Sequence, residues 1–420
     1  MKNLITYLFI LFIGLNLIVS LYGWHQSNKE KGILYNRQTE IIDSVWQVNS
    51  IKNNPSKTES VSKNKTFNIP THDIIIKLQN FINAVVKAKP AFQHTYIEIY
   101  GNLYRLLGRN YMEDSNEDND IVRLPNGQLN FIGKLNNVHT YKNPSIDSNI
   151  AIEQLKYLKE YTNCYSPNTK LYFIIRPHKG YNKLPYGLKL NNNKINISQI
   201  QQLGFNVLDL NYNVPQNRHR AFYHTDHHWR VEYAFTQIPT ICKFIGIDDN
   251  IYTHQNFKLI NTKRKFTGSL TRRTGNGFIT LSDTFKYYRP SFYTEFIADY
   301  YSENKIIHRK GNFDQTLLFL EKQQDQQWDA NLYSICNQGD NPLVRIKNNN
   351  IDKNRILLLG DSFSAPIISY LSLALKEIDC IDLRSCSPDI LLRFIRNNHY
   401  DKILLIYPEY YDKRMYNFKS

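Results

Sequence analysis

The chain has 420 residues, of which 42% are hydrophobic, so it is long enough for one large domain or two medium ones with a substantial core. Its formal net charge of +15 suits contact with nucleic acid, anionic lipid or an acidic glycan, although a solvated surface rich in Lys and Asn accounts for it equally well. No run of lysine and arginine is long enough for a nucleic-acid-binding arm, so we expect no nucleic-acid partner.

The first 23 residues predict a membrane anchor. Residues 4–23 are uncharged and long enough to span the hydrocarbon core of a bilayer, and Lys2 supplies the positive flank that stays in the cytoplasm. A cleaved signal peptide is the alternative, but residues 19–23 match its cleavage site poorly. We therefore expect an uncleaved single-pass anchor over 1–23, with the remainder of the chain outside the cytoplasm.

The remainder divides into a polar stalk over 24–71 and a globular domain over 72–420. The stalk is rich in Asn, Ser, Lys and Thr, which is typical of a flexible linker. In the globular part, helical spacing of apolar residues predicts a helix over 74–86. Asn126-Gly127 lies between two apolar runs and predicts a β-hairpin over 121–132.

An α/β rhythm follows, in which continuous apolar runs indicate strands buried on both faces. Four elements are expected in turn: a helix over 148–161 capped by Asp147, strands over 171–175 and 205–210, and a helix over 227–244 kinked at Pro239.

The last 66 residues have the clearest pattern. Five elements are expected: strands over 355–359, 379–383 and 402–407, and helices over 365–376 and 388–397. This βαβαβ order requires parallel strands with right-handed crossovers. We therefore expect an α/β fold with a mostly parallel sheet, in which ligands lie beyond the carboxyl ends of the strands.

The cysteines predict neither a zinc site nor a disulfide. No pair has C-x-x-C spacing, the number is odd, and we expect small buried side chains, with Cys380 in a core strand. The five are Cys164, Cys242, Cys336, Cys380 and Cys386.

Ser362 is the candidate nucleophile. The segment Gly360-Asp361-Ser362 follows an apolar strand directly, so the serine hydroxyl should be exposed on a sharp turn, close to the free backbone N–H groups that begin the next helix. The alternative is an ordinary loop in which Ser364 caps the helix. The first interpretation predicts acyl chemistry at Ser362.

Asp226 and His228 are the candidate orienting carboxylate and general base. Asp-x-His places both groups on one turn, so the carboxylate can hold the imidazole in the correct tautomer. His224, His227 and His228 surround one aspartate, and a transition-metal site is therefore the rival interpretation. Because consecutive residues cannot easily all face one ion, we expect no metal.

Three further residues are weaker candidates for the site. Arg176 and Lys179 follow the strand over 171–175, where the sheet rule places them near the ligand; Lys179 would meet an anionic substrate, although a solvated loop is equally compatible. Gly268 lies in a turn that either donates an N–H group to an oxyanion or only reverses the chain.

The two motifs Thr225-Asp226-His227-His228-Trp229 and Gly360-Asp361-Ser362-Phe363 together resemble those of the DHHW protein family, which belongs with the SGNH-like, periplasmic alginate-type O-acetyltransferases. The resemblance extends over about 74–410. Weaker shared segments are Gly127-Gln128-Leu129, Arg176-Pro177-His178-Lys179, Phe266-Thr267-Gly268-Ser269 and Asp382-Leu383-Arg384. The order differs from that of ordinary SGNH esterases, in which Gly-Asp-Ser comes first and the histidine stands three residues after the aspartate.

The resemblance implies a three-layer α/β/α domain and a triad of Ser362, His228 and Asp226. It implies an extracytoplasmic, membrane-anchored O-acetyltransferase or acetylesterase that acts on a cell-surface polysaccharide, without a cofactor and with acyl groups supplied by a membrane partner. A catalytically idle glycan-binding or polysaccharide-assembly factor on the same scaffold is the alternative of another class. The sequence does not decide between transfer and hydrolysis.

Overall fold

The computed structural model describes residues 93–419 apart from 113–118, 125–126, 134–143, 178, 180–194, 216–217, 280, 303–304, 325–329, 338 and 410–412. The chain forms two compact units, Met1–Leu103 and Tyr104–Ser420. The predicted anchor, the stalk, the helix over 74–86 and the boundary at residue 72 lie outside the described residues and stay predictions. Among the described helices, none combines the length and the apolar character that a membrane span requires.

The first described elements are a helix and a small antiparallel sheet. Helix α4 (Gln93–Leu106) precedes strands β1 (Tyr111–Met112), β2 (Asn119–Arg123) and β3 (Leu129–Gly133), which pair in the order β1-β2-β3. The turn between β2 and β3 contains Gly127 with a φ of 81°, a conformation that glycine adopts without strain. The predicted hairpin is confirmed.

The main sheet has eight strands in the order β5-β4-β13-β11-β12-β10-β8-β9. The five strands from β5 to β12 are parallel to their neighbours, and the last three pair antiparallel, so the sheet is mixed and mostly parallel, as predicted. The strands are β4 (Lys170–Ile175), β5 (Asn206–Asp209), β8 (Phe296–Tyr301), β9 (Ile306–Gly311), β10 (Leu343–Asn348), β11 (Arg355–Gly360), β12 (Glu377–Ile381) and β13 (Lys402–Tyr407).

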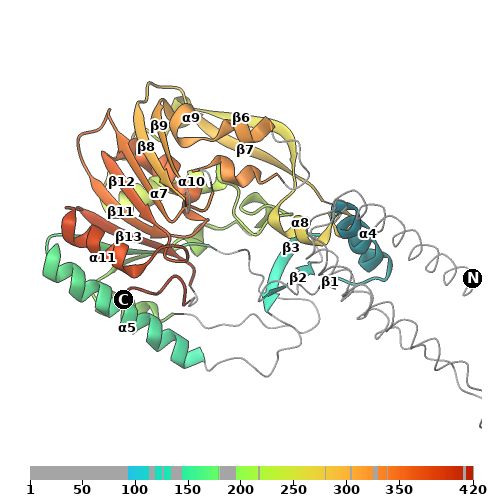
Figure 1. Ribbon diagram of the computed structural model, residues 1–420, viewed down its shortest axis with the longest axis horizontal. Coiled ribbons are helices and arrows are strands. Elements are labelled where there is room, and N and C mark those ends of the chain that lie inside the picture. Colours follow the sequence, from blue (N-terminus) through green and yellow to red (C-terminus); the bar gives the residue numbers. More distant parts are fainter. Residues whose placement is uncertain are drawn as a thin grey trace, which may run out of the picture. The chain divides into compact units, whose positions relative to one another are not determined.

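Helices cover both faces of the parallel strands (Figure 1). Leu357 and Leu405 point to one face, into a core shared with α5 (Pro144–Tyr165), α6 (Ile197–Gln202) and α11 (Pro388–Asn397). Leu358 and Leu404 point to the other, into a core shared with α7 (Val231–Ile245) and α10 (Ser364–Leu371). Because both faces are buried, these strands are mostly apolar; Asp379 of β12 is a buried exception, and its carboxylate accepts from the Tyr400 hydroxyl (2.6 Å).

An antiparallel ribbon and two short helices follow α7 along the chain. The antiparallel ribbon of β6 (Phe257–Phe266) and β7 (Asp283–Pro290) contributes apolar side chains to the core around α7, as does α9 (Phe313–Leu317). Helix α8 (Ser269–Thr274) follows β6 directly. This connection brings the end of the ribbon to the loop before α7, because Leu270 N–H donates to the carbonyl of Thr225 (3.1 Å).

The chain reverses its direction across the sheet at β11. It leaves β11 through α10 to reach β12 on one side, then returns through α11 to β13 on the other, and the two helices lie on opposite faces. The predicted βαβαβ unit is confirmed. In such sheets the ligand lies beyond the carboxyl ends of the strands at the point of reversal, which is where the chain continues from Gly360 into Ser362.

The predicted helix over 227–244 begins later, at Val231. The Asp226 carboxylate accepts a hydrogen bond from the backbone N–H of His228 (2.9 Å), and Trp229 pairs with Phe222, so this segment turns before the helix starts. Pro239 lies inside α7, as predicted. The predicted helix over 365–376 also ends early, at Leu371, and continues as a 3₁₀ turn.

Four of the five cysteines are buried, as predicted, whereas Cys164 is exposed. All five are free thiols. Cys380 lies in β12, in the core.

A substitution in the central strand tests the packing. Leu404→Ala should lower the free energy of unfolding by about 2–5 kcal/mol, because Leu404 is fully buried between the sheet and the α7–α10 layer and its loss leaves a cavity. Leu259→Ala is the matched control, since Leu259 is 44% exposed on β6, and should change stability much less. Urea unfolding of the full chain measures both; equal losses would contradict this account of the core.

Candidate active site

The carboxylate of Asp226 is buried and bound on both oxygens. Its Oδ1 accepts from the backbone N–H of His228 (2.9 Å) and lies 2.6 Å from His228 Nδ1. Its Oδ2 accepts from the backbone N–H of Ser269 (2.6 Å). Burial alone would raise the pKa of Asp226, but His228, His227 and these donors hold it well below its usual range. Asp226 is therefore a carboxylate at neutral pH.

His228 connects this carboxylate to Ser362. With Nδ1 directed at Asp226, its Nε2 lies 2.8 Å from Ser362 Oγ, within the distance required for proton transfer. The structure thus brings Ser362 to Asp226 and His228, from which it is separated by more than 130 positions in the sequence. The arrangement can take the serine proton onto Nε2 while a proton on Nδ1 stays hydrogen-bonded to Asp226.

Aromatic rings enclose the His228 imidazole. The Tyr333 ring stacks on it with centroids 4.0 Å apart and an angle of 12° between the planes, and Phe363 lies 4.8 Å away. The His227 ring is 3.8 Å away, and its Nδ1 lies 2.7 Å from the Ser269 hydroxyl. Burial and the neighbouring His228 lower the pKa of His227 well below its usual range, so His227 is neutral beside the candidate base.

A buried ion pair fixes the turn that carries Ser362. Arg176 donates through Nε (3.1 Å) and Nη2 (2.6 Å) to Asp361 Oδ2, and its guanidinium lies 3.7 Å from the centre of the Phe363 ring. Asp361 Oδ1 also accepts from the backbone N–H of Phe363 (3.0 Å). A Cβ on Gly360 would overlap Ser364, so this tight turn requires glycine.

A second buried network supports the loop that carries Asp226. Lys179 donates to the carbonyl oxygens of His224 (3.1 Å) and Asp226 (2.8 Å). Asp283 accepts from the backbone N–H and the hydroxyl of Thr225 (2.8 Å each) and pairs with Arg230 (2.8 Å). These contacts fix the backbone on both sides of the candidate carboxylate.

The three weaker candidates have structural partners. Arg176 binds Asp361, and Lys179, only 3% exposed, binds backbone carbonyls, so neither side chain is placed for the substrate contact expected from the sequence. The Gly268 N–H donates to Thr225 Oγ1 (3.1 Å), which replaces the expected oxyanion contact. The physical reason is common to all three: buried donors must find acceptors, and internal ones are nearest.

The metal interpretation is geometrically conceivable. Ligand atoms of Asp226, His227 and His228 lie within 4.8 Å of one another. However, both oxygens of Asp226 and both ring nitrogens of His228 already have hydrogen-bond partners, and His227 Nδ1 faces Ser269. An ion would have to replace those bonds, so the donor set fits a proton relay better than a metal.

Two contributors have no local signal in the sequence: Tyr333, which stacks on His228, and Asp283, which binds Thr225. Both lie far along the chain from their partners, and only the fold brings them there. Trp229 and Phe363 belong to the two motifs, but the bond from Trp229 Nε1 to the Phe363 carbonyl (3.0 Å) also depends on the fold. Ser269 belongs to a segment that the sequence does single out, but the binding of its N–H to Asp226 depends on tertiary contact.

Comparison with known proteins shows which solved structures share this fold. No protein-family model matches the chain, and no curated protein matches it in sequence. A DHHW family protein from Eubacterium siraeum is 19% identical, with a TM-score of 0.51 over 71% of this chain and 93% of that one. Bacillus cereus PatB1, solved with a sulfonyl adduct, is 18% identical, with a TM-score of 0.57 over 72% of this chain and 99% of that one. The O-acetyltransferase domain of Pseudomonas putida AlgJ is 13% identical, with a TM-score of 0.38 over 72% and 94%.

The first two similarities show that the chain has the fold of the DHHW family protein and of PatB1. The predicted resemblance is confirmed at this level. Identities of 18–19% extend the conclusion to the fold alone.

The burial of Lys179 predicts a pH-dependent stability. Burial lowers the pKa of its ammonium group from 10.5 to about 7, so between these pH values the unfolded chain binds a proton that the folded chain lacks. The destabilisation is complete below about pH 7 and is lost as the pH rises toward 10.5. The free energy of unfolding should rise across this window by up to about 1.4 kcal/mol per pH unit.

Lys179→Met should remove this rise, as measured by urea unfolding between about pH 7 and pH 9. Lys258→Met, at an exposed lysine of β6, is the matched control and should keep the wild-type slope. An unchanged slope in Lys179→Met would show that another group causes the pH dependence.

Proposed function

We propose that the protein is an extracytoplasmic serine-dependent O-acetyltransferase or acetylesterase that acts on a cell-surface glycan. The observation that carries this proposal is the hydrogen-bonded series from Asp226 through His228 to Ser362, with distances of 2.6 and 2.8 Å. The resemblance of the two motifs to the DHHW family supports the acetyl and glycan parts of the proposal. The N-terminal segment supports a single-pass anchor and a membrane partner that supplies acyl groups.

In the proposed mechanism, Ser362 Oγ attacks the carbonyl carbon of an acyl donor while His228 Nε2 accepts the hydroxyl proton. Asp226 holds the Nδ1–H group and stabilises the imidazolium that forms. The backbone N–H of Ser362 has no hydrogen-bond partner in the described part of the chain, so it can donate to the oxyanion. His228 then protonates the leaving group, and Ser362 carries the acyl group as an ester.

In the second half of the reaction, the same proton transfers occur in the opposite order. A sugar hydroxyl or a water molecule gives its proton to His228 Nε2 and attacks the acyl-enzyme, and Ser362 recovers its proton. Transfer prevails over hydrolysis when the acceptor excludes water from the ester. The Tyr333 ring stacks on His228 and the Phe363 ring lies tilted beside it, which limits the room for water next to the imidazole and supports the transfer reaction.

Removal of the nucleophile tests the mechanism. Ser362→Ala should lower turnover of 4-nitrophenyl acetate by about 10⁴-fold or more, to the level of background hydrolysis. Phenylmethylsulfonyl fluoride should add one sulfonyl group to the wild type and none to Ser362→Ala, as measured by intact mass. Ser364→Ala, at a buried serine whose hydroxyl has no partner in the described structure, is the matched control and should keep activity and labelling.

Turnover that survives in Ser362→Ala would disprove the triad. A wild type that binds glycan but shows neither turnover nor labelling would favour the non-catalytic binding scaffold instead.

A second prediction concerns the loop that carries Asp226. A Cβ on Gly268 would overlap the Thr225 carbonyl and lie 2.5 Å from Asp226 Cβ, so Gly268→Ala must displace the carboxylate. We expect kcat to fall by about 100-fold, as a displacement of this size commonly causes. Gly246→Ala is the control: its φ of 71° makes alanine destabilising by about 1 kcal/mol, but no atom lies within 4 Å of the new Cβ and kcat should persist. Wild-type kcat in Gly268→Ala would contradict the proposed role of the loop.

A further inference from the structure

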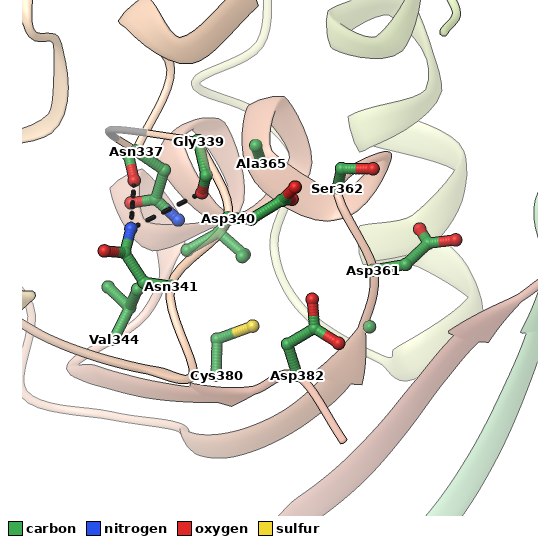
Figure 2. Close-up of a pocket in the computed structure, with 12 residues that line it drawn as sticks. Asn337, Gly339, Asp340, Asn341, Val344, Asp361, Ser362, Ala365, Cys380 and Asp382 are labelled. Atoms are coloured by element: carbon green, nitrogen blue, oxygen red, sulfur yellow. Dashed lines mark hydrogen bonds between the residues drawn. The ribbon is translucent and has the colours of Figure 1, made fainter. Parts of the chain in front are cut away.

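A pocket lies beside Ser362 at the carboxyl ends of β11 and β12 (Figure 2). Its enclosed part is about 20 Å³, which is room for a water molecule or for one hydroxyl group of a sugar. The rest of the recess is open to solvent, and the remainder of a sugar unit would lie there. The pocket has an apolar wall that includes Val344 and Ile368 and a polar wall from the loop before β10.

The side-chain amide of Asn337 is buried, and its oxygen atom can still accept a hydrogen bond from a ligand. Asn337 lines the pocket and is 1% exposed, yet its Oδ1 has no hydrogen-bond partner among the described residues. Its backbone is fixed, since its carbonyl oxygen accepts from Asn341 Nδ2 (2.8 Å). A buried polar atom without a partner destabilises the folded protein, because it has lost its bonds to water without gaining others. A ligand in the pocket that donates a hydrogen bond would remove this cost.

Two carboxylates face the same space. Arg384 binds Asp382 through Nη2 (2.6 Å) and Nε (3.0 Å) and reaches Asp340 through Nη2 (3.3 Å), which holds both carboxylates at the pocket. In Figure 2 the Asp382 carboxylate points toward the side where Asp340 lies, whereas the Asp361 carboxylate points away, toward its partner Arg176. No lysine, arginine or histidine is among the described residues that line the pocket.

These groups select for one chemical class. Carboxylate and amide oxygens accept hydrogen bonds from hydroxyl groups, and the carboxylates repel a bound carboxylate or phosphate. An acetyl methyl group would leave the polar wall unpartnered, so the pocket suits the acceptor better than the acyl group. We propose that this pocket binds the acceptor sugar, whose hydroxyl receives the acyl group from Ser362, and this proposal rests on the proposed function. The acceptor is an uncharged sugar or an amino sugar, and the pocket excludes a uronic acid or a phosphorylated sugar.

In the transfer step, the sugar hydroxyl gives its proton to His228 Nε2 and its oxygen forms the new ester bond. The bond between the acyl carbon and Ser362 Oγ breaks, and Oγ takes the proton from His228. Asn337, Asp340 and Asp382 contact the other hydroxyls of that sugar. They orient it without taking part in proton transfer.

Binding to the full-length Ser362→Ala protein tests the assignment, because it needs no turnover. Isothermal titration calorimetry with cellotetraose, mannotetraose, chitotetraose and tetragalacturonate should show at least one of the first three binding about tenfold or more tightly than tetragalacturonate. Asn337→Gly keeps the positive φ of 58° and should weaken that binding by about three- to tenfold. Asp340→Lys, at a side chain that is 59% exposed, should reduce or reverse the preference for the uncharged or amino-sugar tetrasaccharide over tetragalacturonate.

Asp352→Lys is the matched control, since Asp352 is exposed and precedes β11 at the opposite ends of the parallel strands; it should bind as the parent protein does. The assignment is overturned if no tetrasaccharide binds, if tetragalacturonate binds as tightly as the best of the others, or if Asn337→Gly and Asp340→Lys bind like the parent. A wild type that binds a neutral tetrasaccharide but is not acylated by 4-nitrophenyl acetate would overturn the proposed function and leave the pocket assignment standing.

Discussion

The arrangement around Ser362 depends on one buried carboxylate. Asp226 is 1% exposed, and a charge in that position is tolerated only because three donors converge on it: two from His228 and one from Ser269. The same bonds prevent the start of a helix at this point and orient the His228 ring toward Ser362. The geometry of the candidate base and the local break in secondary structure therefore have a single cause.

The nucleophile is held independently by the sheet. Ser362 follows β11, and Arg176 follows β4, which lies two strands away across β13. Because these strands are parallel, their carboxyl ends meet at one edge, and the guanidinium of Arg176 reaches Asp361. A buried pair of this kind is expensive to break from one side, so it holds the turn in one geometry. Base and nucleophile are thus positioned by two networks, which are joined by the His228–Ser362 hydrogen bond and by the bond from Trp229 Nε1 to the Phe363 carbonyl.

Elements that depend on interactions between residues close together in the sequence could be predicted, whereas those that depend on contacts between distant residues could not. Strands such as β13 and helices such as α11 are predicted with their bounds because continuous apolar runs, and Ser387 as an N-cap with Pro388 after it, are local signals. The start of α7 is not predicted correctly. The hydrogen bond from His228 N–H to the Asp226 carboxylate competes with helix formation, and the periodicity of apolar residues does not reveal this bond. The internal partners of Lys179 were not predicted for a related reason: its burial, which places its ammonium group against backbone carbonyls, depends on the fold.

The sequence by itself determined the α/β class, the closing βαβαβ unit and the two motifs, since apolar periodicity and turn residues act over a few positions. It also determined which side chains were available for acyl chemistry. Only the tertiary structure decided that Asp226, His228 and Ser362 lie within hydrogen-bonding distance and that Tyr333 stacks on the imidazole. It also decided that Asn337 Oδ1, near the nucleophile, has no hydrogen-bond partner among the residues that the structure describes. Those contacts join residues far apart in the chain, and the packing of the whole sheet with its helices sets their distances.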